Sequence, residues 1–148
     1  MGRIELHWDP FDLTDPYPCI NIIIMNSREV IEAGRAMGLE YPGPRPIRAL
    51  LDTGASFTVV NKVLANTYKL FSTNEDFEIT SLADTIHCGE HAAAISFPGT
   101  DLRPFDPIRV LSAVFVKERS YACVIGRDIL RHWVTKFDGR SKRLTITD

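Results

Sequence analysis

The 148-residue chain has no long hydrophobic run and few cysteines. Its longest apolar stretch, Ile20 to Met25, is interrupted and far shorter than the roughly 20 residues of a membrane-spanning helix. The segment Met1 to Leu6 contains no apolar signal core. The three cysteines are Cys19, Cys88 and Cys123, too few and too widely separated for a secreted disulfide framework. We therefore expect a cytoplasmic protein with no membrane partner.

An excess of positive charge is also missing. The chain has 17 Lys and Arg against 19 Asp and Glu, a formal net charge of −2, and its basic residues are scattered. Nucleic-acid-binding domains usually carry a basic stripe, so no nucleic-acid partner is implied. With 45% hydrophobic and 24% charged residues, the chain has the composition of an ordinary globular domain. Its length suits one core, so we expect a single domain over residues 1–148.

Two common catalytic patterns are missing or incomplete. The nucleophile elbow Gly-x-Ser-x-Gly is absent, so Ser56 is not expected to act as a serine nucleophile. His87, Cys88 and His91 lie close together and are residue types that bind zinc. A zinc site needs further ligands, however, and no other cysteine or histidine has a matching spacing. We expect neither a metal nor a cofactor.

What the chain does contain is a carboxylate at the end of an apolar strand. Ala49 to Leu51 runs straight into the sequence Asp52-Thr53-Gly54. A strand end can hold the Asp52 carboxylate in place for acid–base chemistry, and the Thr53 hydroxyl can brace the loop. Gly54 allows two stretches of backbone to approach closely. Because these residue types also form ordinary turns, the meaning of the tripeptide depends on the rest of the chain.

A second pattern lies near the C-terminus. Tyr121 to Ile125 is apolar and partly β-branched, which predicts a buried strand; Gly126 follows, and Arg127 to Leu130 predicts a short helix. Taken alone, this pattern describes a buried strand with a helix cap. Cys123 lies inside the strand and is expected to be a buried, unreactive thiol.

Together and in this order, the two patterns resemble the retropepsin-like, or retroviral-type, aspartic proteases. In that family the Asp-Thr-Gly loop carries the catalytic aspartate, and the segment matching Val124 to Leu130 lies behind it, with the glycine permitting a tight crossing. The resemblance implies an all-β barrel with a short C-terminal helix, which we expect to be the principal helix, near Ile129. It also implies a polypeptide substrate, no cofactor, and catalytic roles for Asp52, Thr53 and Gly54.

The number of Asp-Thr-Gly loops predicts the assembly. A two-lobed enzyme of this class needs two such loops in one chain, and this chain has one. A second copy must therefore supply the partner aspartate, and we expect a homodimer. The expected function is that of an aspartic endopeptidase in which the Asp52 carboxylates of two subunits activate one water. The alternative is a dimeric binding or scaffold module that has this fold without cleavage.

The resemblance also assigns residues that contact the substrate. Ala55 and Ser56 are expected to pair with the extended substrate backbone. At the position of Ser56, retroviral enzymes usually carry Asp, paired to the arginine that matches Arg127, whereas cellular and bacterial relatives often have Ser. The resemblance is therefore to these cellular or bacterial members.

The family also has a flap, a hairpin that folds over bound substrate. Two segments are candidates for its tip here. The favoured tip, which lies just after a predicted strand, consists of Ser81, Leu82, Ala83 and Asp84. The alternative is Cys88-Gly89-Glu90, because Gly89 supplies the turn chemistry that a hairpin needs.

The remaining patterns predict strands, turns and further helices. Strands are expected at Cys19 to Met25, Phe77 to Leu82, His91 to Phe97, Ile108 to Val116, Val134 to Phe137 and Arg143 to Thr147. The last two form a hairpin that is expected to close the barrel. Residues before the first strand are interpreted as an entry segment rich in Pro and Asp, and a turn is expected at residues 72–74.

Two further helices are predicted. One occupies residues 28–38 after the capping residue Ser27, with Val30, Ala33 and Met37 on its packed face. With the loop to Pro44, it resembles an insertion relative to the retroviral proteases. A shorter helix is expected within residues 61–70.

Overall fold

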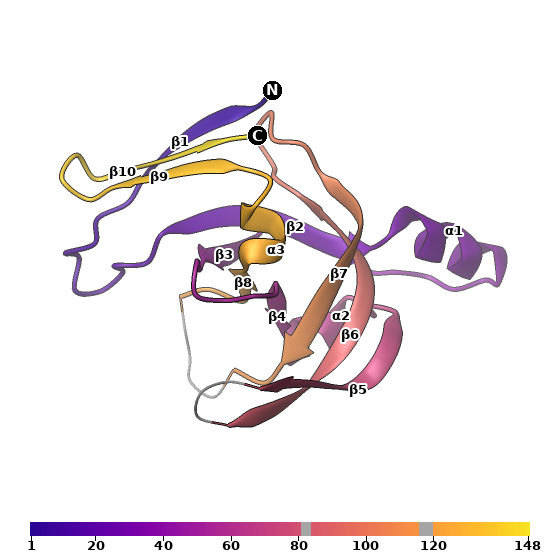
Figure 1. Ribbon diagram of the computed structural model, residues 1–148. Helices are drawn as coiled ribbons and strands as arrows, with labels where there is room; N and C mark the ends of the chain where they lie inside the picture. Colours follow the sequence, from indigo (N-terminus) through magenta and orange to yellow (C-terminus); the bar gives the residue numbers. More distant parts are fainter. Residues whose placement is uncertain (81–83, 116–119) are drawn as a thin grey trace.

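The computed structural model describes residues 1–80, 84–115 and 120–148, and the strands among them form two β-sheets (Figure 1). The larger sheet has seven strands. Their spatial order is β2 (Cys19–Asn26), β3 (Ile47–Leu51), β8 (Cys123–Ile125), β4 (Val59–Asn61), β7 (Phe105–Ala113), β6 (Thr85–Ser96) and β5 (Ser72–Thr80). The prediction of an all-β fold is therefore confirmed.

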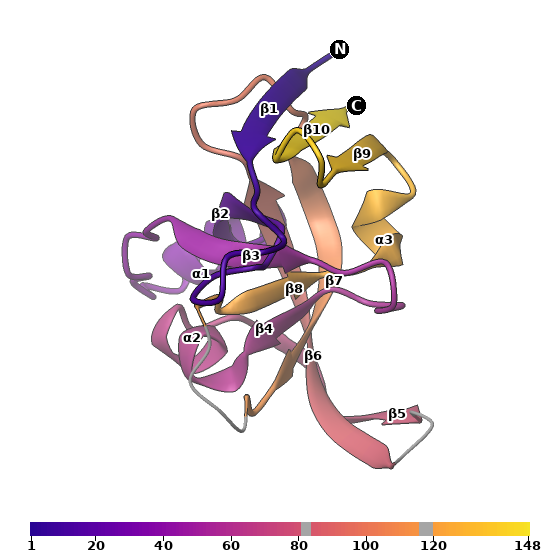
Figure 2. The ribbon, with the colours of Figure 1, turned by 90° about the vertical axis from the view of Figure 1, so that its left-hand side faces the viewer.

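Strand β2 closes the larger sheet into a barrel. Its first half, residues 19–22, pairs with β3, and its second half, residues 23–26, pairs with β6. The ring of β2, β3, β8, β4, β7 and β6 is thus continuous, and β5 extends it from the free edge of β6. Figure 2 shows β5 and the start of β6 reaching beyond the body of the barrel.

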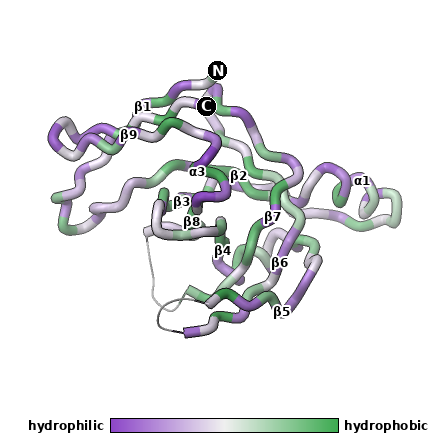
Figure 3. The backbone as a smooth tube through the Cα atoms, in the orientation of Figure 1, coloured by the Kyte–Doolittle hydropathy of each residue, from purple (hydrophilic) through white to green (hydrophobic). Residues whose placement is uncertain are grey.

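The smaller sheet joins the two ends of the chain. It consists of β1 (Arg3–His7), β10 (Arg143–Thr147) and β9 (Val134–Asp138), with Ile4 opposite Ile146. Hydrophobic and hydrophilic residues alternate along it, as expected for a sheet with one buried face (Figure 3). The predicted C-terminal hairpin is confirmed, but the prediction that it closes the barrel was wrong. It pairs instead with β1, a strand that the sequence analysis did not predict in the entry segment rich in Pro and Asp.

The two sheets share one hydrophobic core. Its large, fully buried side chains include Ile22, Ile24, Ile95, Ile125, Ile129, Leu144 and Ile146. They come from strands of both sheets and from the C-terminal helix, so the strands around the Asp52 loop and the terminal sheet stabilise one another. No helix in the described ranges is long and apolar enough to cross a membrane.

Three helices lie among the described residues: α1 (Arg28–Ala36), α2 (Lys62–Thr67) and α3 (Arg127–Leu130). All three were predicted, but α3 has only four residues and is not the principal helix; α1 is longer. The Ser27 hydroxyl caps α1 by accepting a hydrogen bond from Val30 N at 3.5 Å.

The predicted packed face of α1 was wrong. Ala33 and Met37 are exposed, and the buried position is Gly34, which lies against the ring of Tyr41. The Tyr41 hydroxyl donates to Val30 O at 3.3 Å, so the loop after α1 folds back onto the helix. The helix therefore packs on its own loop and projects from one end of the barrel (Figure 1).

Three strand boundaries also differ from the predictions. Residues 72–74, predicted to be a turn, begin β5; β6 starts at Thr85, six residues before the predicted His91, and β7 starts at Phe105. The pairing of β5 with β6 shifts register between residues 72 and 77, which marks β-bulges. A bulged, mostly exposed strand lacks the regular alternation from which a strand is recognised.

Candidate active site

Asp52 lies where a buried strand leaves the barrel. Strand β3 pairs with β2 on one side and runs parallel to β8 on the other, with Leu51 opposite Ile125. Leu51 is buried, and Asp52 N donates to Ile125 O at 3.0 Å. The backbone of Asp52 is thereby fixed by the sheet, while the residue itself is only half-buried. This arrangement leaves the carboxylate open to a water or a substrate.

The turn after Asp52 holds the carboxylate with backbone donors. Gly54 N donates to Asp52 Oδ1 at 2.8 Å, and Ala55 N donates to Asp52 O at 3.2 Å. A Cβ atom at position 54 would lie 3.1 Å from Asp52 Oδ1, a tight contact that favours glycine. Thr53 is exposed, and its hydroxyl has no hydrogen-bond partner within the described chain. Its role as a brace between two loops therefore stays a prediction.

The segment after the turn crosses the junction of β8 and α3 at close range. A Cβ atom on Gly126 would lie 2.6 Å from the backbone C and O of Phe57. Arg127 N donates to Ala55 O at 2.8 Å and ties the two segments together. The predicted close crossing at this glycine is confirmed. Cys123, in β8, is fully buried as predicted, and burial raises the pKa of its thiol.

Sequence reasoning missed Thr58 and Asp128, whose hydrogen bonds hold the two crossing segments together. Thr58 is fully buried; its N donates to Asp128 Oδ2 at 2.9 Å, and its Oγ1 donates to Asp128 Oδ1 at 2.8 Å. Gly126 N in turn donates to Thr58 Oγ1 at 3.2 Å. A buried hydroxyl with these partners is satisfied as donor and acceptor. The only signal in the sequence was a polar residue inside the apolar run Phe57 to Val60.

Ser56 forms a hydrogen bond with Arg127, a contact that the sequence analysis described only for the Asp of retroviral enzymes. Arg127 Nη2 donates to Ser56 Oγ at 2.8 Å, on the exposed side of the loop. Ser56 therefore takes the place that the resemblance gave to Asp, with a neutral hydroxyl in place of a carboxylate. Ala55 and Ser56 lie in the loop beside Asp52, so the structure brings five of the predicted site residues together: Asp52, Thr53, Gly54, Ala55 and Ser56.

Of the favoured flap tip, Asp84 alone lies among the described residues, directly before the start of β6. Thr80 pairs with Thr85, and the exposed Asp84 accepts a hydrogen bond from Thr85 N at 2.7 Å. The other three predicted tip residues, Ser81, Leu82 and Ala83, lie outside the described residues. The alternative tip at Cys88-Gly89-Glu90 was wrong, because these residues lie inside β6, with Gly89 paired to Ser112 of β7.

The histidines near this hairpin have separate environments. His91 Nε2 and Ser112 Oγ lie 2.8 Å apart, and both residues are buried, whereas His87 is exposed on the hairpin. In the described part of the chain, no group of three or more His, Cys, Asp or Glu is placed to hold a metal ion.

The His87 imidazole is expected to titrate above its ordinary range. Its Nδ1 lies 2.6 Å from Asp76 Oδ1 and 4.0 Å from Glu78 Oε1, and the hydrogen bond and charge of Asp76 raise the pKa of His87. A raised folded-state pKa means that the pair stabilises the hairpin fully below the unfolded value of about 6.5 and loses this effect as the pH rises through the folded value. NMR titration of the His87 ring should give a midpoint that Asp76→Asn lowers; equal midpoints in the two proteins would contradict the pairing.

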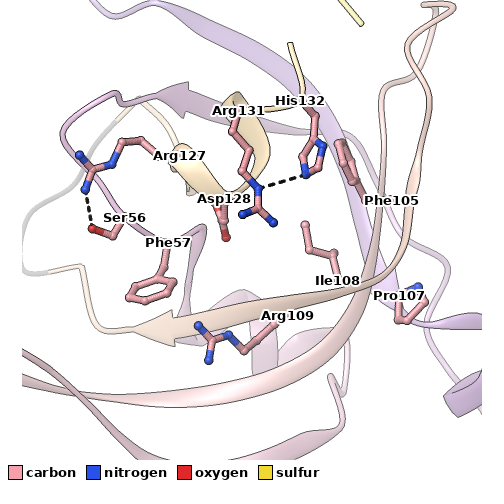
Figure 4. A pocket seen from close by; sticks show the side chains of 10 residues that line it. All are labelled: Ser56, Phe57, Phe105, Pro107, Ile108, Arg109, Arg127, Asp128, Arg131 and His132. Atoms are coloured by element: carbon pink, nitrogen blue, oxygen red, sulfur yellow. Dashed lines mark hydrogen bonds between the residues drawn. The ribbon is translucent and has the colours of Figure 1, made fainter.

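A cavity of about 670 Å³ opens beside the loop that carries Asp52 (Figure 4). Ser56 and Phe57 line it from the loop, Arg127 and Asp128 from α3, and further side chains come from β7 and the turn after α3. Asp52 does not line it. The site thus has two parts, the open Asp52 carboxylate and an adjoining cavity. Ser56, which lines the cavity, follows Asp52 in the same loop.

The architecture is shared with proteins of known structure. The chain superposes on the EIAV protease complexed with the inhibitor HBY-793 with a TM-score of 0.53 and 20% identity, covering 82% of this chain and 91% of that one. It superposes on a retropepsin-like aspartic protease from Rickettsia conorii with a TM-score of 0.57 and 16% identity, covering 98% and 89%. No protein-family model and no curated protein matches the chain. At these identities the likeness shows the fold, which is retropepsin-like as the sequence predicted.

Proposed function

We propose that the chain is an aspartic endopeptidase that works as a homodimer, with the Asp52 carboxylates of two subunits flanking one water. The observation that carries this proposal is the placement of Asp52. Its backbone N donates a hydrogen bond to Ile125 O at 3.0 Å, and its carboxylate accepts a hydrogen bond from Gly54 N at 2.8 Å. The residue is half-buried in a retropepsin-like fold.

The chemistry follows from two carboxylates that face one another. Like charges at short range do not both ionise easily, so one proton is shared between them. The ionised carboxylate removes a proton from the water, and the protonated carboxyl polarises the scissile carbonyl. Proton transfer to the leaving amine then completes the cleavage. Thr53 braces the two loops in this proposal, and Ala55 and Ser56 pair with the substrate backbone.

The proposed dimer supplies what one chain lacks. Each chain carries one Asp-Thr-Gly loop, and the cavity beside that loop does not include Asp52. A second copy that placed its Asp52 opposite would complete the pair and cover the open side of the carboxylate. A symmetric dimer is the commonest way for a soluble protein to build such a two-fold site.

Mixing experiments test the shared site. With a ninefold excess of Asp52→Asn subunits and free exchange, random pairing leaves about a tenth of the wild-type subunits in active dimers, so activity per wild-type subunit should fall roughly tenfold. The same excess of an unrelated protein should have no effect. Unchanged activity in the mixture, together with a monomer in sedimentation, would refute the shared site.

Cleavage of a diverse peptide pool, followed by mass spectrometry, tests the function itself. We expect new peptide termini with the wild-type chain, and their loss when a statine-type inhibitor is added, because its hydroxyl takes the place of the attacking water. Peptides that bind without being cleaved would instead support the binding-module alternative.

A further inference from the structure

The cavity beside the catalytic loop collects cationic side chains in a chain with a net negative charge. Arg127 and Arg131 come from α3 and the turn that follows it, and Arg109 comes from β7 on the opposite wall. Figure 4 shows the Arg131 guanidinium pointing into the space between Asp128 and Ile108. Among the described residues that line the cavity, Asp128 is the sole carboxylate.

The charges of this cavity are not balanced internally. The Asp128 carboxylate is already engaged, because it accepts hydrogen bonds from Thr58 N, Thr58 Oγ1 and Ile129 N at 2.8 to 2.9 Å. Arg127 donates to the neutral Ser56 hydroxyl, and Arg131 Nε donates to His132 Nε2 at 3.3 Å. Within the described chain, neither arginine forms an ion pair. Each guanidinium has five N–H donors, so most of these donors are available to a ligand.

Arg109 is held in place on the opposite wall. Its guanidinium lies over the rings of Phe57 and Phe77, 4.8 and 5.2 Å from their centroids, and pairs with Glu90 at 3.5 Å. Cation–π contacts orient the planar group, and Ile108 and Phe105 contribute apolar side chains to the cavity lining. A carboxylate that entered the cavity would meet guanidinium groups from two sides.

We propose that this cavity binds an acidic side chain of the polypeptide substrate, and that Arg131 is its principal specificity-determining residue. The proposal rests on the proposed endopeptidase function, since it names the class of peptide that the site takes. Ser56 connects the cavity with the proposed substrate site, because it belongs both to the loop expected to pair with substrate and to the cavity wall. A nucleic acid fits less well, because the basic residues gather in a cavity and not along a stripe.

Binding to the full chain carrying Asp52→Asn tests the proposal without requiring cleavage. The probes are two fluorescent peptides, both amidated at the C-terminus, that differ only by Glu→Gln at two positions. We expect the Glu peptide to bind at least about tenfold more tightly at low ionic strength, because charge-assisted Arg–carboxylate hydrogen bonds are stronger than neutral ones. Adding Arg131→Gln should reduce this ratio toward one. The exposed Arg140→Gln on the β9–β10 turn is the matched control and should preserve the ratio.

Three results would overturn the proposal. Equal binding of the two peptides would do so. So would an Arg140→Gln variant that lowers the ratio of the two affinities as much as Arg131→Gln does. The third is that a single-stranded oligonucleotide binds, that Arg131→Gln abolishes this binding, and that the two peptides bind equally. This result would assign the cavity to phosphate.

In an active enzyme, Arg131→Gln should raise KM for Glu-containing substrates and leave kcat nearly unchanged relative to the wild type. Discrimination in the binding assay without any cleavage by the wild type would refute the proposed function and keep the acidic-ligand site.

Discussion

Replacing Asp52 by Asn is expected to lower kcat/KM for peptide cleavage by about 10³-fold or more. General acid–base catalysis by one positioned group contributes roughly 10²–10⁴-fold, and in a symmetric dimer the substitution removes both carboxylates at once. The fold should survive, because the Asn side-chain oxygen can still accept the hydrogen bond from Gly54 N. Steady-state kinetics with a peptide from the cleaved pool provides the measurement.

The control for this prediction is Asp101→Asn, which makes the same substitution at an exposed position away from the catalytic loop. Its kcat/KM should equal that of the wild type, and both variants should unfold at the wild-type urea concentration. Cleavage that persists unchanged in Asp52→Asn would show that another group, or a contaminating protease, cuts the peptides. It would remove the basis of the proposed mechanism.

The elements that the sequence predicted best combine a local pattern with burial. The stretch from Cys123 to Ile129 shows a strand, a glycine and a helix start within seven residues, and Cys19 to Asn26 shows alternate burial of isoleucines. A run of apolar, β-branched residues is typical of a buried strand, so both elements could be recognised without their partners. The position of Asp52 at a strand end followed from the same kind of pattern.

The elements that were missed depend on partners far away in the sequence. Strand β1 exists because Ile4 and Leu6 pair with Ile146 and Leu144, and a five-residue segment shows no such partner from within. The first half of β6, around Gly89, looked like a turn because glycine suits turns, yet β5 and β7 enclose it on both sides. Long-range pairing outweighs local propensity in both cases.

The hydrogen bonds between Thr58 and Asp128 could not be predicted for a similar reason. The two residues are 70 positions apart, and each alone has an ordinary local interpretation: Thr58 as part of a β-branched strand, and Asp128 as an acidic residue in the first turn of a helix. Their bonds form only because the Gly126 crossing brings the two segments together. The position of the loop that carries Asp52 therefore depends on a contact that the local sequence does not reveal.

Replacing Gly126 by Ala is expected to destabilise the chain by about 3 kcal/mol and to abolish most of its activity. The glycine has an extended backbone, with φ −93° and ψ −174°, so an alanine could adopt its conformation. The obstacle is the backbone of Phe57, whose C and O atoms would lie 2.6 Å from the new Cβ. Backbone atoms cannot rotate away as a side chain does, so the two segments must separate, and overpacking of this kind costs about 1–3 kcal/mol. The same separation would stretch the bonds that join Thr58 to Asp128 and Gly126, and would shift the loop that carries Asp52.

The matched control for this prediction is Gly43→Ala, because a Cβ at Gly43 would meet no atom within 4 Å and its φ is not positive. Both substitutions reduce the freedom of the unfolded chain, which by itself stabilises by about 0.4–1 kcal/mol, so the difference between the variants isolates the clash. Urea unfolding followed by circular dichroism should show a clearly lower midpoint for Gly126→Ala and an unchanged or slightly higher one for Gly43→Ala. A misplacement of about 1 Å at a catalytic group can cost 10²-fold in rate, so kcat should fall with Gly126→Ala even at urea-free conditions where the variant is folded. Equal midpoints and equal rates for the two variants would mean that the crossing tolerates a methyl group and does not position Asp52.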